Sequence, residues 1–169
     1  MLMAMETESM GFSEVSDLLW QEREALELLL FKLIEERLIV ASGEIRWLPA
    51  ANREVESVIE QLQSVEIRRA VEVEMMGREH GRNHTMTLSE IASVAGEPWA
   101  TILLDHREHL LSLVAQVEQA SGENRAMLTA GARAIRDTLL AATESVNTYD
   151  SRGVASQATS RPLIMDEHA

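Results

Sequence analysis

The sequence contains no cysteine among its 169 residues, which excludes disulfide bonds, cysteine-based zinc sites and thiol chemistry and fits a cytoplasmic protein. Aromatic residues make up only 4%, too few for the stacking platforms that bind single-stranded nucleic acid. Basic residues number 15 against 28 acidic ones, which gives a net charge of −13. This balance argues against binding to nucleic acid or to an anionic membrane, because both depend on clustered Lys and Arg.

Long apolar runs are also missing: no segment reaches the roughly 18 uncharged apolar residues of a membrane-spanning helix. The first ten residues include Glu6 and Glu8 and no basic residue, so we expect neither a secretory signal nor membrane insertion. Hydrophobic residues nevertheless reach 46%, which is enough for a sizeable core. The length suits one folded domain.

Proline occurs only three times, and most of the few glycines are grouped with the prolines, Gly122 and Gly131 being exceptions. This leaves long blocks rich in Glu, Leu, Ala and Arg. Apolar residues in these blocks recur every three or four positions, and no stretch alternates as a strand would. We expect helices over 13–42, 49–76 and 98–149, and a short helix opened by a Thr87/Glu90 capping box. The residues expected to face the core are Val15, Leu19, Leu26, Leu29, Leu33, Val40, Val55, Val58, Ile59, Leu62, Val65, Ala70, Val73, Met76, Leu103, Leu110, Leu113 and Val117.

These blocks predict an all-α fold, an elongated antiparallel bundle of three long helices and one short helix. Residues 13–149 would form the bundle, and residues 1–12 and 150–169 would be a flexible N-terminal arm and a flexible C-terminal tail. The phase of the apolar stripe slips near Gly122 in the last block. We therefore expect a long helix that is kinked or unwound at Gly122, with two helices in line as the alternative.

Motifs of enzyme chemistry are missing: the chain has no nucleophile elbow, no phosphate-binding glycine loop and no HExxH sequence. His106 and His109 lie three residues apart on one helix, but a metal site needs ligands that converge from facing elements. We interpret them as partly solvated bundle histidines and keep a metalloprotein that uses both as an alternative. We expect no enzyme activity, no metal and no cofactor.

The three tryptophans, Trp20, Trp47 and Trp99, allow two interpretations. Trp47 and Trp99 lie near the starts of long helices, so core packing at the ends of the bundle is the interpretation we favour. A role as an anchor for a partner protein is the alternative.

The C-terminal half of the last helix carries more apolar surface than one narrow seam requires, because Leu139 and Leu140 point about 100° apart. The interpretation we favour is that this surface packs inside a wider bundle core. A partner's amphipathic helix lying along it is the alternative.

Several segments of the chain together form a recognisable pattern: 27–38, 41–48, 54–58, 66–73, Pro98-Trp99, Asp105-His106-Arg107, 123–128 and 149–153. They cover most of residues 18–153, and their order and spacing are more specific than any single segment. In this pattern the chain resembles the FlgN family of flagellar type III export chaperones, most closely its actinobacterial branch.

The resemblance implies a cytoplasmic helical chaperone that binds the terminal helical segments of hook-filament junction (hook-associated) proteins. Such a chaperone prevents premature assembly of its client and delivers it to the export apparatus at the membrane. Family members bind clients through the C-terminal helical region, which corresponds to the last helix here, residues 98–149. The residues that we expect to contact the client are Asn124, Met127, Leu128, Ile135, Leu139, Val146 and Tyr149.

One further alternative is a structural coiled-coil protein that uses the same stripes only to associate with itself. The sequence leaves the oligomeric state open between these two functions.

Overall fold

The computed structural model describes residues 2–82 and 84–147 of the chain. These residues form α1 (Leu2–Ser42), the 3₁₀ turn η1 (Ile45–Trp47), α2 (Leu48–Glu79), α3 (Leu88–Val94) and α4 (Trp99–Asn147), with no strand among them. The predicted all-α bundle is therefore confirmed. The chain divides into two compact units, residues 1–127 and 128–169, and α4 begins in the first and ends in the second.

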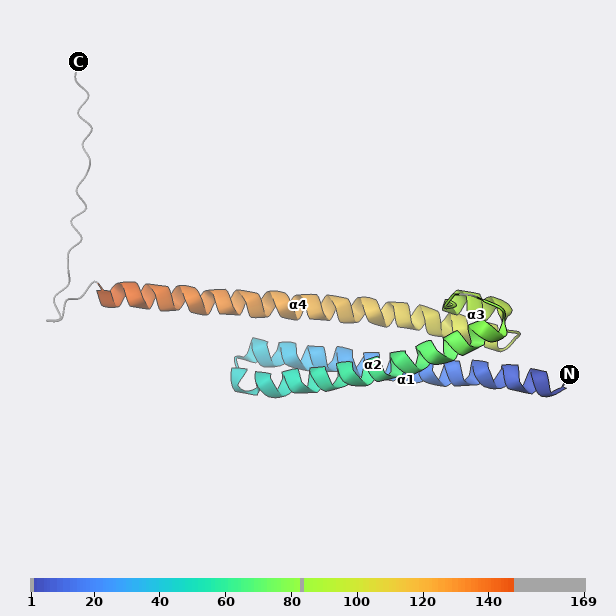
Figure 1. Cartoon of the computed structure of the whole chain (residues 1–169). Coiled ribbons are helices and arrows are strands. Elements are labelled where there is room, and N and C mark those ends of the chain that lie inside the picture. Colours follow the sequence, from blue (N-terminus) through green and yellow to red (C-terminus); the bar gives the residue numbers. More distant parts are fainter. Residues whose placement is uncertain (1, 83, 148–169) are drawn as a thin grey trace, which may run out of the picture. The chain divides into compact units, whose positions relative to one another are not determined.

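In the first unit, α1 and α2 form an antiparallel hairpin, and α3 lies at the end of the hairpin where α4 begins (Figure 1). The hairpin turns at Gly43, whose φ of 76° is open to glycine at little cost. Pro49 occupies the first turn of α2, where its missing N–H is not needed. Gly43 and Pro49 therefore mark the end of α1 and the start of α2.

The core of this unit forms where the apolar stripes of the helices meet. One cluster joins α1 and α2 to α3 and to the first turns of α4, and Leu19, Ile91 and Leu103 are completely buried within it. A second cluster, Leu29, Leu33, Val58 and Ala120, continues the core toward the hairpin turn. Burial of these stripes is the main force that holds the helices together.

Two polar contacts between α1 and α4 show in which direction these helices run relative to each other. Ser16 faces His106 near the start of α4, and the carbonyl of Leu33 accepts a hydrogen bond from Asn124 further along. Residue numbers therefore rise together on α1 and on this part of α4, so the two helices run parallel. Because α2 runs against both, the three long helices have up-down-up topology.

A buried ion pair joins α1 to α2. The Nε of Arg69 lies 2.6 Å from a carboxylate oxygen of Glu22, whose side chain is almost fully enclosed. Burial raises the pKa of Glu22, and the nearby Arg69 counteracts part of that rise. The pair adds little net stability, because removing both charges from water offsets much of their attraction.

The capping box of α3 is confirmed. The backbone N–H of Glu90 donates to the Thr87 hydroxyl, and the Glu90 carboxylate accepts from the Thr87 backbone N–H at 2.8 Å. This backbone hydrogen bond, together with His84 and the Thr87 hydroxyl, lowers the pKa of Glu90 to about 2.

One predicted boundary was wrong. Residues 2–12, expected to form a flexible arm, are the first turns of α1, because Phe12 is buried in the core and no proline interrupts the helix. The predicted long last helix is confirmed: α4 runs through Gly122 as one helix, which excludes an unwound segment there and the alternative of two helices in line. The predicted tail, residues 150–169, lies outside the described residues.

Several residues of the predicted stripes are not buried. Ile59 and Ala70 are exposed on α2. Trp20 and Trp47, which we expected in the core, are 50% and 55% exposed, whereas Trp99 packs against the core at the start of α4. None of the described helices combines the length and the apolar character needed to cross a membrane.

Candidate functional site

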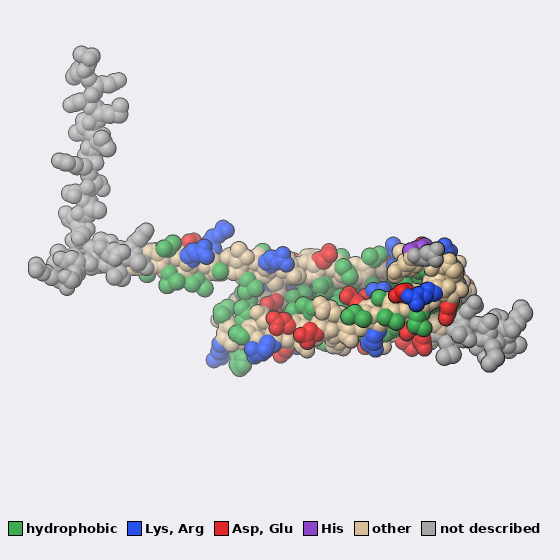
Figure 2. All heavy atoms as spheres, in the orientation of Figure 1, with side chains coloured by type: hydrophobic (Ala, Val, Ile, Leu, Met, Phe, Trp, Pro, Cys, Tyr) green, Lys and Arg blue, Asp and Glu red, His purple; other side chains and the backbone are tan. Residues whose placement is uncertain are grey.

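The C-terminal half of α4 carries large aliphatic side chains on its surface. Ile135, Leu139 and Leu140 are 65%, 63% and 58% exposed, respectively. Ile135 and Leu139 lie one helical turn apart on the same face, and Leu140 widens that face. Figure 2 shows hydrophobic side chains on the surface of this part of α4.

Small side chains surround these aliphatic residues. Alanine or glycine occupies 130–132, 134, 141 and 142, so another helix can approach closely. The charged residues between 128 and 142 are Arg133, Arg136 and Asp137, which give this stretch a net charge of +1 in a strongly acidic chain. Ile135, Leu139 and Leu140 thus form an apolar strip on a stretch of α4 that is almost neutral.

Other predicted contact residues have different surroundings. Met127 and Leu128 are half-buried. Val146 lies within α4, but its side chain is outside the described residues, and so is Tyr149 as a whole. Contact roles for these residues stay predictions.

Asn124 is not on an open surface, although we expected it to contact a partner. Its side chain is 5% exposed, and its Nδ2 donates to the Leu33 carbonyl at 2.8 Å and to Glu36 Oε2 at 2.7 Å. From α2, the Asn52 amide reaches the other Glu36 oxygen at 2.8 Å when its nitrogen is turned toward α1. The buried Glu36 carboxylate therefore joins three helices, and Asn124 has a structural role in this junction.

His106 and His109, three residues apart on α4, lie in unlike environments. His106 is 1% exposed, so the expectation of a partly solvated residue was wrong for it. Its Nε2 lies 3.2 Å from the Ser16 hydroxyl, and Trp20 covers its ring edge-on. His109 is exposed and its Nδ1 lies 2.9 Å from the Asp105 carbonyl. Within 2–82 and 84–147, no three His, Asp or Glu side chains gather as a metal site would require.

The burial of His106 predicts a loss of stability in mild acid. Burial lowers the pKa of His106, and the positive charge of Arg23 lowers it further, so folding favours the neutral imidazole. As the pH falls through about 6.5 the unfolded chain takes up more of a proton at this group than the folded chain does, so stability falls with the pH. The slope from this group is at most about 1.4 kcal/mol per pH unit, the value for one whole proton, and it ends below the folded-state pKa.

Urea unfolding of the wild type at pH 7.5, 6.5 and 5.5 measures this slope, and His106→Leu should flatten it. The matched control is His109→Gln, in which most of the slope should persist, because His109 makes the smallest contribution to the lowered pKa of His106. An unchanged slope in His106→Leu would contradict the assignment.

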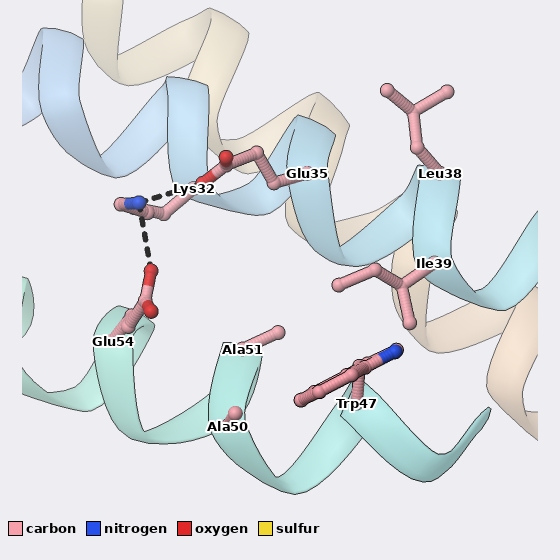
Figure 3. Close-up of a pocket in the computed structure, with 8 residues that line it drawn as sticks. All are labelled: Lys32, Glu35, Leu38, Ile39, Trp47, Ala50, Ala51 and Glu54. Carbon is pink, nitrogen blue, oxygen red and sulfur yellow. Dashed lines mark hydrogen bonds and ion pairs between the residues drawn. The ribbon is translucent and has the colours of Figure 1, made fainter. Parts of the chain in front are cut away.

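A hollow at the turn of the hairpin was not predicted. It encloses about 410 Å³ between α1 and α2, over the small side chains of Ala50 and Ala51. Trp47 and Ile39 form one end, and the other is closed by Lys32, whose Nζ lies 2.7 Å from both Glu35 and Glu54 (Figure 3). Because Lys32 is held by both carboxylates, the hollow offers an apolar recess and no group poised for chemistry. The sequence signal was Trp47, for which a partner-anchor role was the less favoured interpretation.

Comparison with known proteins identifies one family. A family model described as FlgN protein matches residues 5–157, which is most of the chain. Neither a curated protein nor a solved structure matches it.

Proposed function

Since the chain belongs to the FlgN family, a family of flagellar export chaperones, we propose that it binds the helical terminal segments of hook-filament junction proteins. It would hold these hook-associated proteins apart before assembly and deliver them to the type III export apparatus. We place this activity in the cytoplasm and, on the resemblance of the sequence, in the actinobacterial branch of the family. A family of chaperones implies a binding function and no enzyme activity.

The observation that supports this site is the exposure of Ile135, Leu139 and Leu140 on α4. Apolar surface gains about 25 cal/mol for each Å² that is removed from water, so a client helix laid along this strip would be bound mainly by burial. The arrangement fits a client whose terminal segment is disordered before assembly. Such a client must become ordered on binding, which lowers the affinity and favours later release.

Chaperone activity also needs the client's own assembly surface to be covered. Terminal segments that later pack against one another as helices expose apolar stripes of the same kind as the strip on α4. When a client helix binds along the strip on α4, its own apolar stripe is covered and is no longer accessible to other client molecules. This reasoning supports α4 as the client site.

The test is the stoichiometry of the complex with the terminal helical segment of a hook-associated protein. Light scattering at several protein concentrations should show a monomer that becomes a one-to-one complex when the segment is added. A homodimer that ignores the segment would instead support the structural coiled-coil protein and contradict the chaperone function.

A further inference from the structure

A second apolar groove lies on the hairpin of the first unit, between α1 and α2. Its volume is about 380 Å³, and its apolar lining consists of Leu18 from α1 and Ile67 and Val71 from α2. Leu18 is buried and forms the base, while Ile67 and Val71 are 65% and 50% exposed along one side. The groove is thus a shallow apolar channel open to solvent.

The apolar surface continues beyond the groove. Ile67, Val71 and Met75 follow one another at intervals of four residues, so they form a stripe of about two turns on one face of α2. Met75 is 51% exposed. A stripe at this spacing matches the i, i+4, i+8 pattern by which one amphipathic helix packs against another.

The charges around this groove are mainly negative. Three carboxylates line it, Glu14 and Asp17 from α1 and Glu72 from α2, against the single guanidinium of Arg68. Arg68 donates through its Nη2 to the Gln21 amide oxygen at 2.7 Å, so it is held on the surface of the hairpin. A ligand in the groove therefore meets an apolar floor and an acidic rim.

We propose that this groove, which we call the α1–α2 groove, binds a basic amphipathic helix of a partner protein. The apolar face of that helix would cover Ile67, Val71 and Met75, and its Lys or Arg side chains would face Glu14, Asp17 and Glu72. Opposite charges across an interface favour encounter and fix the register. This surface is separate from the strip on α4, so the protein would hold a second partner besides its client.

A second copy of the chain fits the α1–α2 groove poorly. Each copy carries a net charge of −13, and a symmetric contact would bring the same acidic rims together. An anionic membrane meets the same repulsion. Charge therefore selects a basic helix over both.

The test uses two synthetic helical peptides with the same leucine face, one with lysine and one with glutamate on the polar face. Fluorescence anisotropy should show that the full-length protein binds the lysine peptide at least about tenfold more tightly than the glutamate peptide. Ile67→Ser combined with Val71→Ser should weaken binding of the lysine peptide about tenfold or more, because two exposed aliphatic side chains lose their burial. Glu14→Lys combined with Asp17→Lys should reverse the preference between the peptides.

The matched control is Leu104→Ser combined with Leu111→Ser, two exposed leucines on α4 in the same unit. This variant should keep the affinity within about twofold, and circular dichroism should show that all variants stay helical. Equal losses in the control and the groove variant would overturn the proposal, as would an unchanged preference in Glu14→Lys/Asp17→Lys. A dimer that the Ile67→Ser/Val71→Ser variant abolishes would overturn it in favour of a second copy. The groove substitutions leave Ile135, Leu139 and Leu140 unchanged, so failure of this proposal is distinguishable from failure of the client site on α4.

Discussion

Replacing Ile135, Leu139 and Leu140 together by glutamine should weaken binding of the client's terminal helix at least about 100-fold. Each of these side chains is more than half exposed and would become buried beneath the client. Loss of about 1 kcal/mol from each removes about 3 kcal/mol of binding free energy, and each 1.4 kcal/mol is a tenfold change. Glutamine is a good helix former, so the variant should remain helical.

The measurement is a calorimetric titration of the full-length variant with the terminal segment of a hook-associated protein, with circular dichroism as a check of folding. The matched control, Leu104→Gln combined with Leu111→Gln, changes two exposed leucines nearer the start of the same helix. We expect the control to bind like the wild type. Wild-type affinity in the triple variant would show that the client lies elsewhere, even if the chain is an export chaperone.

Asn124→Asp should lower the free energy of unfolding by about 3 kcal/mol. The substitution places a second carboxylate 2.7 Å from that of Glu36, in a site almost closed to water, and removes the donor to the Leu33 carbonyl. Uncompensated charge and unsatisfied hydrogen-bonding groups in such places typically cost several kcal/mol. For a chain of this size the melting temperature should fall by roughly 6–12 °C.

Thermal unfolding measures this change, and Glu118→Gln serves as the exposed control on the same helix that should melt close to the wild type. At a temperature where Asn124→Asp is still folded, its affinity for the client should match that of the wild type. A variant with normal stability but no client binding would show that Asn124 contacts the client, as the sequence indicated, and would contradict its structural role.

Periodicity in the sequence predicts the helices of this protein well. The spacing of Val58, Val65 and Val73 predicts α2 to within about three residues at each end, because an amphipathic helix repeats every 3.6 residues whatever lies next to it. The capping box at Thr87 and Glu90 is equally local and was equally visible. Local signals fail where distant residues determine the structure: α1 begins earlier than predicted, and Phe12 near its start is buried in the same core cluster as Met76 of α2.

Side-chain roles were harder to predict than helices. His106 and His109 have similar sequence surroundings, yet one is buried under Trp20 and the other is exposed. Asn124 looked like part of a binding surface, since nothing near it in sequence reveals Leu33 and Glu36, about ninety positions away. A polar residue on a helix shows its partner only when the helices are assembled.

The sequence alone determined that this protein is all-α, acidic and free of disulfides, because composition and helical period are properties of the chain itself. It also marked the main apolar stripes, in which Leu103 and Ile135 looked equally prominent. Only the tertiary structure decided that Leu103 lies completely inside the core while Ile135 stays exposed. Burial depends on whether another helix covers a residue, and that cover comes from segments far away in the sequence.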